Sequence, residues 1–278
     1  MIQTARLIVI PTKVSNRRPS PVTLVVKQVE KTVVKMSESN AADFEILVNS
    51  VKRIKGMDTA EDSAQAFIDI IYEYFQASLV LLRLFLSVPY AALPTQEKQL
   101  VDKKSNDSGT AHLYNDGTPV LTLLGTRGQK SEWNERHKSQ GFRCIPLVSS
   151  AYVSSLSMLS MQFKKMGFDL RLLDAWDKTI VAIGHADEYS GMLYVHHAGI
   201  DKDEQGRMIV PHQAFVAENN IKSVVGFGGG YPNHPTIATL FAFTNEILSE
   251  SMIKPFASLL EAYISISKGL VGSGRILS

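Results

Sequence analysis

The stretch that decides the fold is Ile221-Lys-Ser-Val-Val-Gly-Phe227, followed by Gly228-Gly-Gly230 and then by Thr236-Ile-Ala-Thr-Leu-Phe-Ala-Phe-Thr244. Both runs are rich in β-branched and aromatic residues, which is typical of strands. The glycines between them indicate a connecting turn. Because short turns join antiparallel strands, whereas parallel strands need a long crossover, the sequence predicts an antiparallel pair here.

Further apolar segments lie upstream of this pair. They predict strands over residues 79–87, 120–124, 144–148, 179–183 and 191–197, with 208–210 continuing after a charged turn at 201–206. The stretch from Gln96 to Gly117 is rich in Lys, Asn, Asp and Gly, which predicts a loop. Together these patterns indicate a central antiparallel sheet of about six strands.

Four helices are expected around this sheet. Asn40 caps the first and Thr59 or Asp58 caps the second, and each helix has apolar residues on one face. A third helix is expected from Ser149 or Ser150 to Gly167, and a fourth from Ser249 or Ser251 to Leu270. Helices grouped around a meander of strands predict an α+β fold rather than a doubly wound parallel sheet.

Composition narrows the class of protein. The 278 residues are 45% hydrophobic and 20% charged, with a net charge of +2, which is typical of a globular chain. The longest apolar run is interrupted by Arg83 and Pro89, so no membrane span is expected, and the small net charge gives no reason to expect nucleic-acid binding. Cys144 is the one cysteine, which excludes an internal disulfide. We expect a cytoplasmic protein.

Charge divides the chain into two parts. Residues 1–35 hold seven basic side chains and one acidic one, giving +6, whereas the remaining residues hold 22 basic and 26 acidic ones, giving −4. This asymmetry predicts that residues 1–35 are a basic, disordered extension and that residues 36–278 form a single domain.

The predicted arrangement resembles a GAF/PAS-like sensory domain, most closely a GAF-type domain, over about residues 60–271. Three stretches correspond to strands and a helix of that family: Gly191-Met-Leu-Tyr-Val195, the Ile221–Phe227 stretch, and the final strand with its long terminal helix. The resemblance implies a pocket for a small molecule over one face of the sheet. The Asn-Lys-x-Phe-Asp-Glu signature of cyclic-nucleotide-binding members is absent, so the ligand and any cofactor stay unknown.

The resemblance also implies a role in signal transduction. GAF-like sensors pass their signal through the terminal helix, and no kinase, cyclase or helix-turn-helix segment follows Leu270. We therefore expect a sensory domain without its own output domain, which signals through a separate output protein or through a homodimer formed by the first and last helices.

The candidate ligand site centres on a polar cluster between Gly125 and His137. Arginine recognises carboxylate or phosphate in a bidentate manner, and tryptophan offers a stacking face. Aromatic and imidazole groups on the predicted strands complete the expected lining. The candidate ligand-binding residues are Arg127, Trp133, Asn134, Arg136, His137, Tyr194, His196 and Phe227. The competing interpretation is a solvated loop packed by one tryptophan, with the other aromatic residues in the core.

An enzyme is the alternative class. In this interpretation Arg127, Arg136 and His137 form an anion clamp with acid–base function for a small anionic substrate. The sequence contains no His-Glu-x-x-His metal motif and no Gly-x-Ser-x-Gly nucleophile motif, so neither a metal nor a catalytic residue is assigned.

Overall fold

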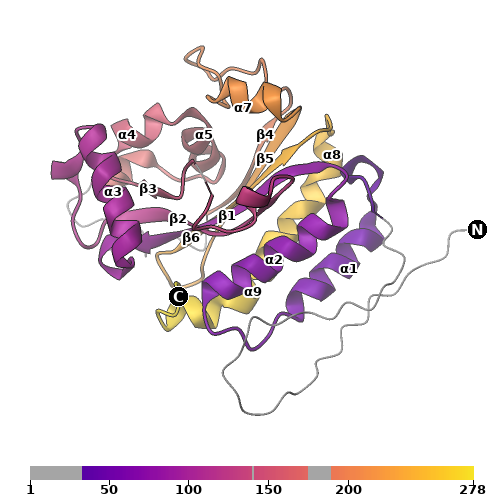
Figure 1. Cartoon of the computed structure of the whole chain (residues 1–278), viewed down its shortest axis with the longest axis horizontal. Helices are drawn as coiled ribbons and strands as arrows, with labels where there is room; N and C mark the ends of the chain where they lie inside the picture. Colours follow the sequence, from indigo (N-terminus) through magenta and orange to yellow (C-terminus); the bar gives the residue numbers. More distant parts are fainter. Residues whose placement is uncertain (1–32, 140, 175–188) are drawn as a thin grey trace, which may run out of the picture.

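The structure is a computed structural model that describes residues 33–139, 141–174 and 189–278 (Figure 1). The strands are β1 (Leu79–Pro89), β2 (Pro119–Gly128), β3 (Cys144–Pro146), β4 (Ser190–Val195), β5 (Ser223–Gly230) and β6 (Ile237–Thr244). The helices are α1 (Ala41–Lys52), α2 (Ala60–Phe75), α3 (Thr95–Asp107), α4 (Ser150–Ser155), α5 (Ser157–Lys165), α7 (Gln213–Glu218), α8 (Glu250–Ile253) and α9 (Ala257–Gly272).

The described residues form one six-stranded sheet in the order β3-β2-β1-β6-β5-β4, and every neighbouring pair is antiparallel. The predicted α+β class with a central antiparallel sheet and flanking helices is therefore confirmed. The predicted strand at 179–183 lies outside the described residues. Residues 208–210 form no strand, since Met208 makes an isolated bridge with Lys202.

The glycine run is part of a strand and does not end it. Gly228 and Gly229 pair with β6 and β4 inside β5. A Cβ on Gly228 would lie 2.1 Å from the Sδ of Met166, and one on Gly229 would lie 2.8 Å from Ile264. Side chains on both faces of the sheet therefore approach the backbone closely at these two glycines.

The predicted loop over residues 96–117 is wrong at its beginning, because Thr95–Asp107 form helix α3. This helix is polar over most of its surface, and its few buried positions include Val101 and Glu97. A helix with so narrow an apolar face lacks the broad stripe by which amphipathic helices are recognised in a sequence. The position of α3 beside β3 becomes important for the site described below.

Three of the four expected helices have a predicted N-cap whose side chain accepts a hydrogen bond, and in the third of them Ser149 accepts from the Tyr152 amide. The side chain of Asn40 accepts a hydrogen bond at the start of α1 and forms a capping box with Asp43. The Thr59 hydroxyl accepts from the Asp62 amide at the start of α2. The third expected helix is divided at Leu156, where the backbone leaves the helical region and separates α4 from α5.

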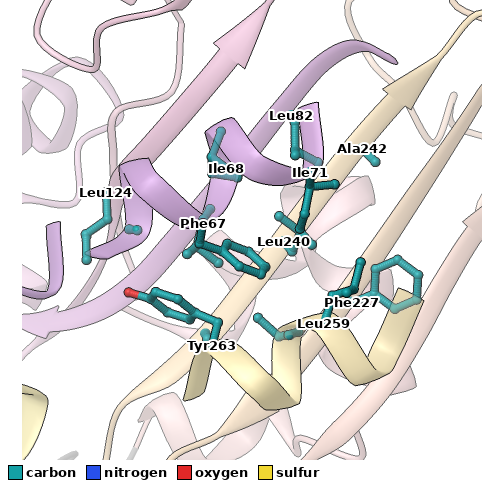
Figure 2. Packing of buried hydrophobic residues seen from close by; sticks show 14 of the residues in the cluster. Phe67, Ile68, Ile71, Leu82, Leu124, Phe227, Leu240, Ala242, Leu259 and Tyr263 are labelled. Atoms are coloured by element: carbon teal, nitrogen blue, oxygen red, sulfur yellow. The ribbon is translucent and has the colours of Figure 1, made fainter. Parts of the chain in front are cut away.

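Two apolar cores lie on the two faces of the sheet. Helices α1, α2 and α9 cover one face, and α4, α5 and α7 lie on the other (Figure 1). In the first core, Phe67 of α2 packs against Tyr263 of α9, over Leu240 of β6 (Figure 2). Burying each such side chain contributes on the order of 1.5–3 kcal/mol, so this layer fixes both helices on the sheet.

The first and last long helices contact one another within the chain. Phe44 of α1 lies edge-on to Phe256, which directly precedes α9, with 4.7 Å between the ring centroids. The inner face of α9 therefore packs in the first core. A homodimer through these two helices stays a prediction, and it would have to use their outer faces. In the part of the chain that the structure describes, no helix is both long and apolar enough to cross a bilayer.

Candidate functional site

A buried charged cluster lies between α2, α3 and the segment before β3. The Nε of Arg136 lies 2.5 Å from Oε1 of Glu61, and its Nη1 lies 2.9 Å from Oε1 of Glu97. Arg136 is 4% exposed and Glu97 is 1% exposed. Because Glu61 and Glu97 lie in the first turns of α2 and α3, their charges also suit the helix N-termini.

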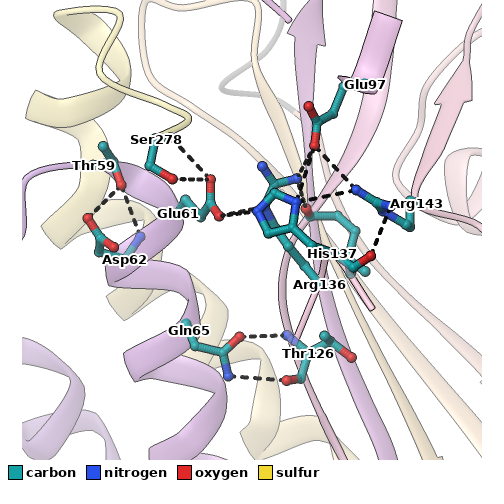
Figure 3. A network of polar contacts seen from close by, with 11 residues as sticks. Thr59, Glu61, Asp62, Gln65, Glu97, Thr126, Arg136, His137, Arg143 and Ser278 are labelled. Carbon is teal, nitrogen blue, oxygen red and sulfur yellow. Dashed lines mark hydrogen bonds and ion pairs between the residues drawn. The ribbon is translucent and has the colours of Figure 1, made fainter. Parts of the chain in front are cut away.

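Two further side chains extend this cluster towards the surface (Figure 3). The imidazole of His137 lies 3.7 Å from Glu61 and 3.9 Å from Glu97. Arg143 places Nη2 3.4 Å from Oε1 of Glu97 and donates from Nη1 to the His137 carbonyl. The Glu97 carboxylate therefore fixes the orientation of two guanidinium groups, one buried and one beside a cavity.

The cavity lies between α3 and β3 and has a volume of about 320 Å³. Its walls are formed by Leu100, Lys103, Lys104, Gly141, Arg143 and Cys144, and Asp107 is the carboxylate on it. Three cations and one carboxylate give the wall a net positive charge. We call it the α3–β3 cavity, and its charge and size suit a small anion.

Lys104 is the half-buried cation of this wall. Burial lowers the pKa of its ammonium group to about 8, from an ordinary value near 10.5. Its Nζ lies 3.5 Å from the centroid of the Phe142 ring, which holds the side chain in place. A lysine with such a pKa is partly an uncharged amine near neutral pH, and this form can accept a proton.

Cys144 lies on the same wall as a protonated thiol. Burial, reinforced by the nearby Glu97 carboxylate, raises its pKa to about 11, although Arg143 and Arg136 oppose this shift. We expect the native thiol to react with a thiol reagent near pH 8 about 100-fold more slowly than in concentrated urea, because its thiolate fraction is that much smaller. Equal rates in the two conditions would contradict this assignment.

The same shift gives a pH dependence of stability. Between pH 9 and about 11 the folded state keeps the Cys144 proton that the unfolded chain has lost, so the free energy of unfolding falls as pH rises. The effect is isolated by subtracting the unfolding free energy of Cys144→Ala measured by urea denaturation. The difference should shrink across this range, and a constant difference would contradict the raised pKa.

The residues predicted from the sequence to form one site are dispersed. Arg127 pairs with Asp69 of α2 at 3.4 Å. Arg136 pairs with Glu61 of the same helix, eight residues before Asp69. The partners of Arg127 and Arg136 are therefore about 12 Å apart along α2. The Asn134 side chain accepts from the Gly128 amide, which closes the turn after β2. Of the polar cluster, the structure brings only Arg136 and His137 together.

The aromatic candidates belong to different cores. Trp133 packs edge-on to Phe215 in the second core, whereas Phe227 stacks on Phe256 in the first, on the other face of the sheet. The Tyr194 hydroxyl donates to the Leu248 carbonyl at the rim of the first core. His196 is exposed, with its ring 5.4 Å from that of Tyr194. Trp133 therefore lies in the other core from Phe227 and Tyr194.

Sequence reasoning missed Glu97, Lys103, Lys104 and Arg143. The first three lie in the stretch taken as a loop, where no functional position was assigned. A helical interpretation would have aligned Glu97, Leu100, Val101 and Lys104 on one face, by their spacings of three and four. In the described ranges, 33–139, 141–174 and 189–278, no group of three or more His, Cys, Asp or Glu side chains could hold a metal ion.

Comparison with known proteins gives similarities to solved structures. No protein-family model and no curated protein matches the chain. The structure of free methionine-R-sulfoxide reductase from Neisseria meningitidis, in complex with its substrate, is similar with a TM-score of 0.45 and 8% identity, over 87% of this chain and 99% of that one. At these values the similarity assigns no activity to this chain.

The prediction of a sensory domain is wrong. The residues expected to line one hollow over the sheet are instead divided between two cores. Among the described residues, the α3–β3 cavity with the charged cluster behind it is a candidate site.

Proposed function

We propose that the protein is an enzyme that acts on a small anionic substrate, bound in the α3–β3 cavity. The observation that carries this proposal is the wall itself, on which Lys103, Lys104 and Arg143 face a space of about 320 Å³ with Asp107 as the carboxylate among the lining residues. The arrangement is consistent with membership of the GAF-like class, which stays part of the proposal.

Arg143 is the residue that would orient the anion. Its position is fixed from behind by Glu97 and by the His137 carbonyl. Its Nε is buried and has no hydrogen-bond partner among the described residues. The charged guanidinium lines the cavity and can pair with a carboxylate or phosphate.

Lys104 is the residue that would transfer a proton. Its amine form, made accessible by the lowered pKa, can accept a proton from a substrate held by Arg143. His137 contributes through Arg143, which it helps to orient. Arg127 and Arg136, which the sequence suggested as the clamp, are paired with Asp69 and with Glu61 and Glu97 and take no direct part.

Anion binding is tested by thermal unfolding in orthophosphate, glycolate and chloride at equal ionic strength. We expect phosphate or glycolate to raise the melting temperature of the wild type, because a ligand that binds only the folded state stabilises it. The double variant Lys103→Gln, Lys104→Gln should lose this gain. Lys164→Gln, at an exposed lysine paired with Glu204, should keep it.

Catalysis is tested by incubating the protein with a mixture of small carboxylates and phosphate esters and following their consumption by NMR. We expect one component to be consumed, at least about tenfold more slowly with Lys104→Gln because the proton acceptor is absent. An absence of anion-specific stabilisation in the wild type would overturn the proposed function.

A further inference from the structure

We infer that Lys104 forms a covalent imine with a small oxo acid, a carboxylate that carries an adjacent aldehyde or ketone group, in the α3–β3 cavity. The inference rests on the proposed function, because it assumes that this cavity binds an anion. It adds the chemical class of the substrate and the atom that reacts.

The position of Lys104 distinguishes it from the neighbouring lysine. Lys103 and Lys104 both line the cavity, but Lys103 is exposed whereas Lys104 is half-buried against the Phe142 ring. Lys103 and Arg143 place two further cations on the same wall. Desolvation is a condition that activates a lysine amine as a nucleophile, and the half-buried Lys104 meets it.

The substrate class follows from two lining residues of the cavity. Arg143, which precedes β3, offers a guanidinium to a carboxylate, and Lys104 of α3 lines the same space. A small molecule held by its carboxylate at Arg143 would share this space with the Lys104 amine. A carbonyl group at that carbon is the electrophile that an amine attacks, which selects an oxo acid over a simple carboxylate or a phosphate.

The reaction balances without a further reactant. The amine lone pair of Lys104 attacks the carbonyl carbon, a C–N bond forms, and the carbonyl oxygen takes a proton to give a carbinolamine. The nitrogen then loses its proton, the C–N double bond forms, and the hydroxyl group leaves as water after a second protonation. Asp107, which lines the cavity, is the carboxyl group there that can carry these protons.

The experiment uses glyoxylate as the oxo acid and glycolate as its matched anion without a carbonyl group. The full-length protein is incubated with glyoxylate, treated with borohydride to reduce any imine, and digested for peptide mass spectrometry. We expect the wild type to carry one reduced adduct, located at Lys104. Glycolate should give no adduct and should compete with its formation.

Matched variants separate the inference from the proposed function. Lys164→Arg, at an exposed lysine that does not line the cavity, should be modified as fully as the wild type, whereas Lys104→Arg should lose at least about 90% of the adduct, because a guanidinium keeps its charge but is not a nucleophile. If the wild type binds glycolate but carries no adduct at Lys104, the imine is refuted and the proposed function stands. If it neither binds glycolate nor forms the adduct, both are refuted. Because the adduct is located on the wild type, this result does not depend on folding of a variant.

Discussion

Replacing Arg136 with methionine is expected to lower the free energy of unfolding by about 3–5 kcal/mol. The substitution removes the guanidinium that Glu61 and Glu97 share, at 2.5 and 2.9 Å. Glu97 is 1% exposed and would keep a buried charge with only the more distant Arg143, at 3.4 Å. Breaking a buried ion pair in this way costs more than the pair contributes, since the remaining carboxylate has lost both water and its partner.

Urea denaturation of Arg136→Met measures this loss, and Lys138→Met provides the matched control. Lys138 is two residues away, but it pairs with Glu135 at the surface with 70% of its side chain exposed. Exposed pairs contribute at most about 1 kcal/mol, so the control should stay close to the wild type. A loss below about 1 kcal/mol in Arg136→Met would show that the cluster does not hold α2 and α3 together.

A double variant tests the physical reason for the loss. Adding Glu97→Gln to Arg136→Met removes the carboxylate charge that the first substitution leaves buried. We expect the double variant to recover about 1–3 kcal/mol relative to Arg136→Met, because an amide is less costly to bury than an unpaired carboxylate. If the two losses simply add, Glu97 and Arg136 are not coupled, and the orientation of Arg143 by Glu97 is also in doubt.

The sheet was predictable because its strands carry strong local signals. The apolar runs around Leu82, Val225 and Leu240 are short and bounded by turn residues, and each lies in an observed strand. The helix caps Asn40 and Thr59 were predictable for the same reason, since a cap is recognised from a few adjacent residues. The strands and helix caps that were predicted correctly are those whose signal lies in residues close together in the sequence.

The site was not predictable, since its parts are distant in sequence. Glu61, Glu97, Arg136 and Arg143 meet only because α3, which follows β1, packs beside β3. Helix α3 was taken as a loop because charged and polar residues dominate it. Adjacent residues in the sequence also diverge: Trp133 joins the second core while Arg136, three residues later, enters the charged cluster. Proximity in sequence therefore does not predict proximity in the fold here.

Replacing Gly191 with alanine is expected to destabilise the protein by about 3 kcal/mol, at the upper end of the usual cost of overpacking. Gly191 lies in β4 where the end of α5 crosses the sheet. A Cβ at this position would lie 2.1 Å from the carbonyl oxygen of Lys165 and 2.4 Å from its carbonyl carbon. Because these are backbone atoms at the C-terminus of a helix, no side-chain rotation relieves the contact, and α5 must move.

The close approach of α5 involves more than one glycine, which explains why the effect should be large. Gly191 pairs with Gly228 on the neighbouring strand, and a Cβ on Gly226 would lie 2.2 Å from Oε1 of Gln162 in the same helix. The backbone of α5 therefore lies almost directly on β4 and β5, and lifting it at Gly191 also separates Met166 and Gln162 from the sheet. The second core would lose contacts on both sides of the displaced helix.

Gly269→Ala is the matched control for Gly191→Ala. Gly269 lies in α9, is exposed, and has no atom within 4 Å of an added Cβ. There alanine should stabilise the protein by roughly 0.5–1 kcal/mol, because glycine in a helix loses more backbone entropy on folding. Urea denaturation of both variants should thus give shifts of opposite sign. If Gly191→Ala is as stable as the wild type, α5 does not rest on the sheet as described, and the second core must be packed differently.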